Sequence, residues 1–178
     1  MAFLVAPGRK QYHCHMEPAR RDTVIRWLAA GGPREWHIAA DIWNWDSGHD
    51  ILALISEQPE CDGSTAQLIY ARAEASYYVT DPEAFAKGKS DSGSVFNLVL
   101  DMLARWRSGF YTSRKFRLPE DDTNTWANVV LSYQLEVIDR WNRDPELMLP
   151  RDFIFLPYGE RPNVDWIKIP QEIKEIVG

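Results

Sequence analysis

Apolar residues recur at helical spacing along most of the chain. Spacings of three and four residues place such side chains on one face of an α-helix. The first clear stripe consists of Val95, Leu98, Val99, Met102, Leu103 and Trp106. The second consists of Trp126, Val129, Val130, Tyr133, Val137 and Trp141. The pattern therefore predicts two long helices, at about residues 93–108 and 122–142.

Shorter helices are predicted where proline, glycine and polar caps bound an apolar run. Pro18 opens a segment that Gly31, Gly32 and Pro33 close. The further predicted helices are residues 33–43, residues 51–58 and residues 62–78, the last capped by Asp62 or Ser64. Residues 81–94 are polar and carry glycines, so we expect a loop there, with at most one helical turn at 82–86.

The C-terminal part, residues 145–178, contains several prolines and few helical repeats. We expect an extended tail that ends in a short helix within PQEIKEIVG. The best candidates for strands are QYHCHM and DFIFL, but no longer run alternates with period two. The predicted fold is therefore mainly α. We expect one domain over residues 1–178, built as a bundle of antiparallel helical hairpins with an extended, Pro-rich C-terminal tail.

The composition narrows the class of protein. The formal net charge is −6, which argues against a nucleic-acid binder, because phosphate contacts need a basic surface. No apolar run approaches the roughly 18 residues of a membrane span, and MAFLVAPGRK does not resemble a signal peptide. Cys14 and Cys61 do not suggest a disulfide framework. We expect a cytoplasmic protein with no cofactor, no nucleic acid and no membrane partner, in an oligomeric state that the sequence leaves open.

The stretch WNWDSGHD, residues 43–50, places acids, a serine and a histidine ahead of an apolar run. Ser47 and Asp50 have the Ser-x-x-acid spacing of a capping box, in which the serine oxygen accepts a backbone N–H three residues on. We therefore predict that Ser47 caps the next helix. The alternative is catalysis, with His49 and Asp46 as an acid–base pair or as metal ligands.

His13 and His15 are two residues apart, so on a strand they would point the same way and could share a zinc ion. A structural zinc site needs about four ligands, and the sequence offers no second Cys/His pair. We therefore predict no metal site. No phosphate-binding glycine loop, nucleophile elbow, His-Glu-x-x-His or Cys-x-x-Cys motif is present.

The segment from Trp45 to Tyr78 resembles a bacterial family known only as a domain of unknown function. Its members tend to have Trp-Asp-x-Gly, a short apolar helix, Gln-Pro-x-Cys-Asp, Thr-Ala-x-x-Ile-Tyr and an aromatic pair. The matching residues here are Trp45, Asp46, Gly48, Gln58, Pro59, Cys61, Asp62, Thr65, Ala66, Ile69, Tyr70, Tyr77 and Tyr78. GFYTSRKFRLPEDDTNTW is similar to such proteins more loosely. The resemblance implies a helical hairpin over residues 43–78, with Cys61 packed in its turn or, alternatively, acting as a reactive thiol. It also suggests a likeness to small immunity or accessory proteins of toxin systems.

Two functions from different classes follow. The first is a non-enzymatic binding protein, an immunity-type inhibitor that occludes a bacterial toxin domain, with surplus tryptophans as interface anchors. The residues expected to contact that partner are Asp41, Trp43, Trp45, Asp46, Asp121, Asp122 and Trp126. The second is a small hydrolase or metal-dependent enzyme that uses His49 and Asp46, with His13 and His15 as further candidates.

Overall fold

Helices make up most of the chain in the computed structural model, which describes residues 12, 14–162, 169, 171, 174 and 175. The elements are α1 (Pro18–Ala30), α2 (Pro33–Ile42), the 3₁₀ helix η1 (Trp45–Ser47), α3 (Asp50–Ser56), α4 (Gly63–Arg72), α5 (Ala75–Thr80), α6 (Pro82–Ser90), α7 (Val95–Arg107) and α8 (Glu120–Arg140). The mainly helical fold is confirmed. In the described part of the chain, β-pairing is limited to the isolated bridges Cys14–Gly48 and Phe116–Glu160.

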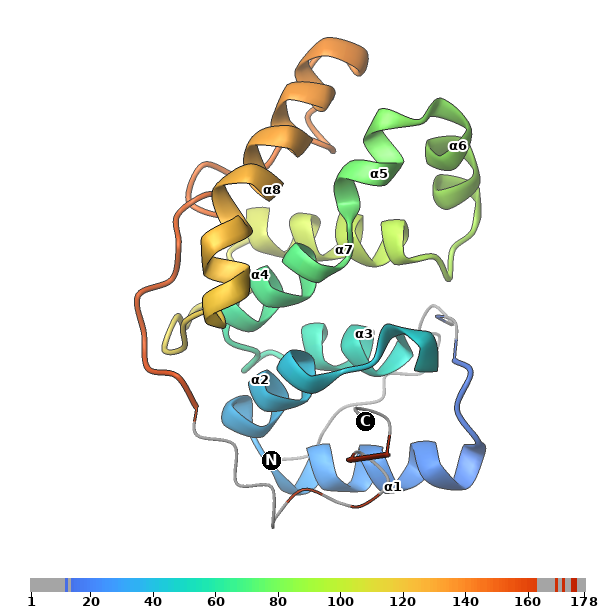
Figure 1. Cartoon of the computed structure of the whole chain (residues 1–178), viewed down its shortest axis with the longest axis vertical. Coiled ribbons are helices and arrows are strands. Elements are labelled where there is room, and N and C mark those ends of the chain that lie inside the picture. The colour runs from blue at the N-terminus through green and yellow to red at the C-terminus, as the bar shows by residue number, and fades with distance from the viewer. Residues whose placement is uncertain (1–11, 13, 163–168, 170, 172–173, 176–178) are drawn as a thin grey trace.

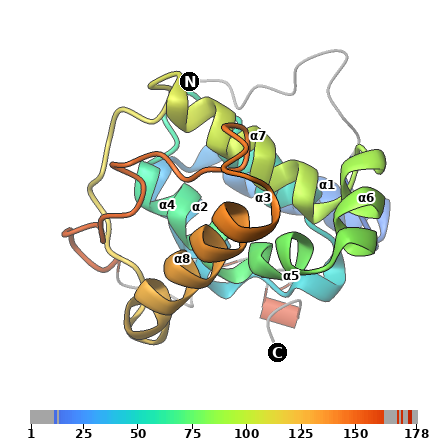
Figure 2. The same cartoon turned by 90° about the horizontal axis from the view of Figure 1, so that it is seen from above.

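The helices are stacked along the long axis of the molecule (Figure 1). Helix α1 lies at one end, α2 and α3 follow, and α4 and α7 occupy the middle. Helices α5, α6 and α8 form the other end, where α5 packs against both α6 and α8 (Figure 2). Helix α4 also packs against α2 and α8, so it joins the two halves. Within the described residues, no helix combines the length and apolar character needed to cross a membrane.

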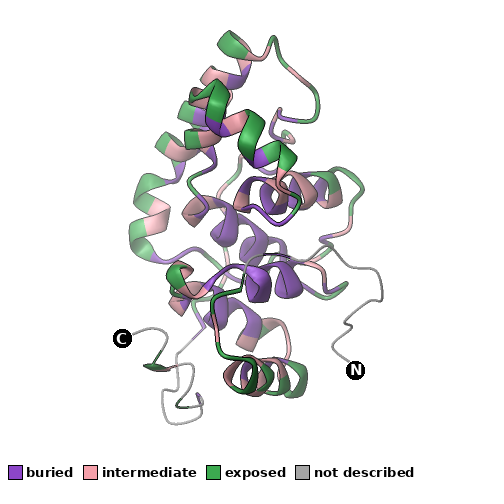
Figure 3. Ribbon diagram, turned by 90° about the vertical axis from the view of Figure 1, so that its right-hand side faces the viewer, coloured by how far each residue is buried: buried purple, intermediate pink, exposed green. Residues whose placement is uncertain are grey.

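The core is centred on α3 and α4, which are buried along nearly their whole length (Figure 3). Every residue from Asp50 to Ser56 and from Gly63 to Tyr70 is buried. Asp62 begins α4 as predicted, because its carboxylate accepts the backbone N–H of Ser64 at 3.0 Å. Its second oxygen accepts hydrogen bonds from the Ser113 hydroxyl and the Lys115 backbone, both at 2.7 Å. One buried carboxylate thus caps α4 and fixes the connector before α8.

Two helical predictions are wrong in detail. Residues 62–78 do not form one helix, because the backbone turns left-handed at Glu74, with φ of 47°, and separates α4 from α5. Residues 82–90 are helical although we expected a loop. The Asp81 side chain caps that helix, and the Phe85 ring stacks on Trp141 with 3.7 Å between ring centroids. Packing against α8 therefore outweighs the weak helical pattern of this polar segment.

The C-terminal segment folds against the helices as turns and bends, and DFIFL is not a strand. Phe153 is fully buried in the core. The backbone carbonyls of this segment are bound by side chains: Gln67 donates to Phe153 and Phe155, and Trp126 donates to Ile154, each at 2.8 Å. These bonds replace the partner strand that a β-strand would need. The final helix expected in PQEIKEIVG lies largely outside the described residues.

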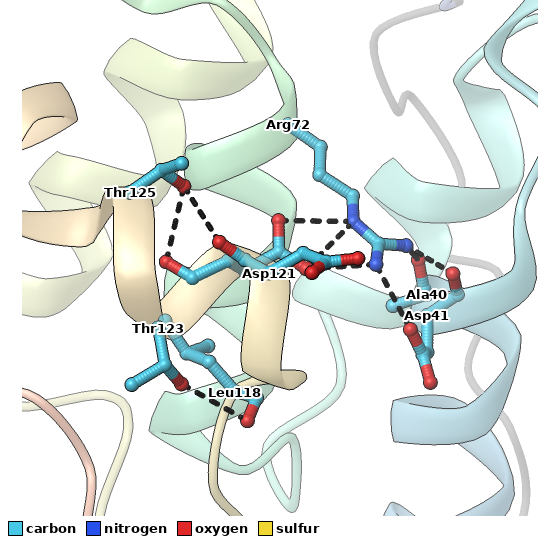
Figure 4. A network of polar contacts seen from close by, with 8 residues as sticks. Ala40, Asp41, Arg72, Leu118, Asp121, Thr123 and Thr125 are labelled. Atoms are coloured by element: carbon cyan, nitrogen blue, oxygen red, sulfur yellow. Dashed lines mark hydrogen bonds and ion pairs between the residues drawn. The ribbon is translucent and has the colours of Figure 1, made fainter.

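Arg72, the last residue of α4, joins three helices (Figure 4). Its guanidinium group donates to the carboxylates of Asp41 at 2.9 Å and Asp122 at 2.8 Å. It also donates to the backbone carbonyl of Asp41 and, at 3.4 Å, to that of Ala40, where α2 ends. The side chain is only 25% exposed. Two carboxylates and two helix-end carbonyls therefore depend on one cation.

We predict that Arg72→Met lowers the free energy of unfolding by about 2 kcal/mol or more, because it leaves two partly buried carboxylates without a cation. Urea unfolding of the wild type and the variant measures the difference. Arg140→Met is the matched control, since Arg140 pairs with Glu136 on the exposed surface of α8 and should contribute less than about 0.5 kcal/mol. Equal losses in the two variants would contradict the central role of Arg72.

His37 lies in the interior, where its Nδ1 is 3.0 Å from the Thr65 hydroxyl and its ring packs on Phe116. Burial lowers the pKa of His37 from 6.5 to about 4, although the nearby carboxylates of Asp41 and Asp62 act in the opposite direction. The folded chain therefore excludes a proton that the unfolded chain binds between pH 6.5 and pH 4. In this window the free energy of unfolding falls as the pH falls.

We predict that this histidine alone costs about 2 kcal/mol of stability between pH 7 and pH 5. His37→Gln, which keeps a polar group near Thr65, should remove that part of the pH dependence. Urea unfolding at several pH values provides the measurement. If wild type and variant lose stability in parallel over this range, His37 is not the group responsible.

Candidate partner-binding groove

A groove lies where α4, α5 and the start of α7 meet the segment after α2, and we call it the aromatic groove. Its volume is about 480 Å³. It is lined by Trp45, Arg72, Ala73, Glu74, Tyr77, Tyr78 and Val95. A smaller cavity of about 230 Å³ shares Tyr77, Tyr78 and Val95 and continues to His49, Ala84, Lys87, Gly88, Asp91 and Ser94. The two hollows are therefore neighbours, with two tyrosines and a valine between them.

The break at Glu74 positions the two tyrosines. It ends α4 and starts α5 in a new direction, so Tyr77 and Tyr78 lie beside the groove. The Tyr78 ring stacks on the buried Phe96 with 5.0 Å between centroids, and Tyr77 meets Tyr78 edge to face at 5.4 Å. A Cβ atom at Gly88 would come within 2.9 Å of the Tyr78 ring. Glycine therefore leaves room for the stack, and Tyr77 remains 57% exposed.

Trp45 forms another wall from the 3₁₀ helix η1. The Asn44 side chain caps this short helix by accepting the backbone N–H of Asp46 at 2.9 Å. The Trp45 ring packs partly against the core, and its indole N–H is buried without an acceptor among the described residues. Trp45 is thus held by packing rather than by a hydrogen bond from its ring.

Carboxylates surround the groove. Asp41 and Asp122 bind Arg72, which itself lines the groove. Glu74 is exposed on the wall, and Asp46 and Asp121 are exposed beside Trp45 and Asp122 in the chain. The structure therefore gathers Asp41, Trp45 and Asp122 of the predicted partner-binding residues around one feature, although α2 and α8 are far apart in sequence.

Trp43 and Trp126 are not exposed, contrary to the expectation that they contact a partner. Trp43 is 4% exposed, and its indole N–H donates to the Gly48 carbonyl at 2.7 Å. Trp126 is 2% exposed and donates to the Ile154 carbonyl. Both indoles fix non-helical backbone from inside the core, so they act as structural anchors. The acidic residues next to them remain at the surface.

The capping box predicted at Ser47 is also wrong. Ser47 ends η1, and His49 precedes α3 without a capping hydrogen bond from its side chain. Asp50 is buried, and its carboxylate accepts a hydrogen bond from Arg21 at 2.6 Å. Asp50 therefore links α3 to α1 through an ion pair with Arg21 and does not take part in a capping box.

His49 lies in the wall of the smaller cavity but is engaged with the backbone. Its Nε2 is 2.6 Å from the Gly93 carbonyl oxygen, which can only accept, so Nε2 carries the proton. The ring also meets Tyr12 edge to face. Asp46 is exposed on η1. Of the other suggested ligands, His15 is exposed and His13 lies outside the described residues. No group of three His, Cys, Asp or Glu side chains suited to a metal occurs in the described part.

Cys61 lies in the turn between α3 and α4 and is 1% exposed. Burial, reinforced by the neighbouring Asp62 carboxylate, raises the pKa of the Cys61 thiol well above its ordinary value. A thiol in this state is a poor nucleophile, because the thiolate is the reactive form. Its environment is that of a small apolar core residue.

Sequence reasoning did not assign Arg72, Glu74, Tyr77 or Tyr78 to a site. Tyr77 and Tyr78 do stand in the family pattern, but a continuous helix over 62–78 gave no reason to place them at a surface hollow. Arg72 directly follows a long run of buried residues. Because charged side chains are rarely buried without a partner of opposite charge, this position indicates an ion pair. The left-handed residue that creates the groove carries no recognisable sequence signature, since it is a glutamate.

Comparison with known proteins supports the family resemblance. Searches of curated proteins and of solved structures find no match. Residues 32–104 match the sequence model of a family described as a domain of unknown function, DUF4274. This segment includes every residue that lines the aromatic groove and the smaller cavity. The resemblance to an uncharacterised domain family is therefore confirmed for residues 32–104, the segment that is similar to the DUF4274 family model.

Proposed function

We propose that this chain is a non-enzymatic binding protein and that the aromatic groove with its surrounding carboxylates is the surface that receives a protein partner. The observation that carries the proposal is Tyr77, a large aromatic side chain that is 57% exposed between Trp45 and Tyr78. Tyrosine and tryptophan are enriched at protein interfaces and dominate their binding energy. An exposed tyrosine beside two further aromatic side chains therefore offers an anchor for a partner.

The charge distribution favours a basic partner. Glu74 is exposed on the groove wall, and Asp46 and Asp121 are exposed next to Trp45 and Asp122 in the chain. The charge of Arg72 is already matched by Asp41 and Asp122. The whole chain carries a formal net charge of −6. Such a surface accelerates association with a positively charged protein and disfavours acidic ones.

More specifically, we propose an immunity-type inhibitor that binds a bacterial toxin or effector domain in the cytoplasm and occludes its active surface. Many toxin domains must engage anionic substrates and carry basic clefts for this purpose, which an acidic binding surface complements. On this proposal, the adjacent upstream gene encodes a large secreted protein with a variable C-terminal toxin domain. That C-terminal domain is the probe for the binding experiments below. A metabolic operon at this position would count against the proposal.

We predict that Tyr77→Ala weakens binding of that domain by roughly 30-fold or more, as expected when an interface anchor is removed. Calorimetric titration measures the affinity, and unfolding curves check that the variant is folded. Phe155→Ala is the matched control, because Phe155 is 62% exposed on the C-terminal segment away from the groove. An unchanged affinity for Tyr77→Ala would remove the groove from the interface.

The carboxylates should act mainly on the association rate. We predict that the double variant Asp46→Asn, Glu74→Gln slows association about tenfold at low salt and by much less at high salt, because screening removes long-range attraction. Stopped-flow mixing at several ionic strengths measures both effects. A faster dissociation with no change in association would instead indicate short-range contacts with the partner. Substrate turnover by the purified chain that is lost in His49→Ala would favour an enzyme instead.

A further inference from the structure

A larger hollow lies outside residues 32–104, the segment that matches the DUF4274 family model. It has a volume of about 770 Å³ and lies between residues 117–118, the first turns of α8 and residues 156–161. This size is within the range of small-molecule sites, which is roughly 300–1,000 Å³. Its walls combine two arginines, Arg117 and Arg161, with the apolar side chains of Leu118, Leu156 and Pro157.

The backbone places the two arginines side by side. Phe116 and Glu160 form a parallel bridge, in which the Glu160 N–H donates to the Lys115 carbonyl at 2.9 Å and the Arg117 N–H donates to the Glu160 carbonyl at 3.2 Å. In this register Arg117 lies opposite Arg161. Glycine at position 159 permits this close approach, because a Cβ atom there would come within 2.2 Å of the Lys115 carbonyl oxygen.

Two like charges opposite each other on paired strands destabilise the fold. Some other arginines of the chain do have acidic partners, such as Arg114 with Asp152 at 2.7 Å. Neither Arg117 nor Arg161 has an ion pair or a side-chain hydrogen bond among the described residues. Glu160 precedes Arg161 in an extended segment, so its side chain lies on the opposite side of the bridge from the two arginines. Glu120 lines the hollow but forms no ion pair with either guanidinium group. Among the described residues, no acidic side chain neutralises the charge of these two arginines.

We propose that this hollow binds a small organic phosphate. Guanidinium groups bind phosphate oxygens in pairs through parallel N–H donors, and two adjacent arginines match the charge of a phosphomonoester. The apolar wall of Leu118, Leu156 and Pro157 receives the organic part, and Tyr158, which is 94% exposed at the rim, offers a ring on which a flat group stacks. The Glu120 carboxylate is an acceptor for a ligand hydroxyl or amino group.

The test compares adenosine monophosphate, adenosine and inorganic phosphate as probes of the intact chain in chloride buffer of constant ionic strength. We expect adenosine monophosphate to bind more tightly than inorganic phosphate and at least about tenfold more tightly than adenosine. Only the monophosphate has both a phosphate group for the two arginines and an organic part for the apolar wall. Arg117→Gln and Arg161→Gln should each weaken binding of the monophosphate by roughly tenfold. Tyr158→Ala should weaken binding of the monophosphate and leave that of inorganic phosphate unchanged.

Arg143→Gln is the matched control, since Arg143 is exposed beyond the far end of α8, about 30 Å from the hollow at the rise of an α-helix. Thermal unfolding gives a second measurement. Phosphate should raise the melting temperature of the wild type but not of Arg117→Gln, and without phosphate this variant should be at least as stable as the wild type, because the repulsion is removed. No binding of either phosphate probe at millimolar concentration, or equal binding by the arginine variants, would overturn the proposal. So would binding of adenosine as tight as that of its monophosphate.

Discussion

The guanidinium group of Arg72 is the interaction on which the arrangement of the helices depends. It stands at the end of the buried helix α4 and holds the last carbonyls of α2, a carboxylate of α2 and a carboxylate of α8. At the other end of α4, Asp62 fixes the connector that leads into α8. A helix buried on all sides has no amphipathic face to orient it, so the charged residues at its ends take over that role. The same network sets the acidic surroundings of the aromatic groove.

Four tryptophans, a residue type that the sequence alone suggested for partner contacts, satisfy backbone carbonyls where regular structure ends. Trp36 donates to Leu28 in the last turn of α1, and Trp141 donates to Val79 in the last turn of α5. Trp43 and Trp126 do the same for the connector after η1 and for the C-terminal segment. Carbonyls at such positions lack helical partners and are costly to bury alone. A chain of several short helices has many of them, which gives a structural reason for the abundance of tryptophan.

Periodic apolar stripes predicted α1, α2, α3, α7 and α8 because each of these helices turns one face to the core or is apolar throughout. They failed for α6, whose stability comes from the stack of Phe85 on Trp141, a contact between residues far apart in sequence. They also missed the break at Glu74, because left-handed backbone at a glutamate is imposed by the packing of α5 between α6 and α8. The capping box failed for a similar reason: the buried Asp50 carboxylate is bound by Arg21 from α1. The acidic candidates were recoverable from sequence, whereas the hollow beside them depends on tertiary contacts.

The left-handed turn at Glu74 divides the molecule into parts with different tolerance for change. On one side, α3 and α4 are fixed by dense packing and by buried polar contacts. On the other side, α5 and α6 pack against α7 and α8, and the exposed side chain of Tyr77 belongs to this part. Substitutions of exposed side chains there, such as Tyr77, alter the shape of the groove while the interior packing stays as it is. A protein that must keep pace with a changing partner benefits from this separation, because recognition and folding are then selected on different residues.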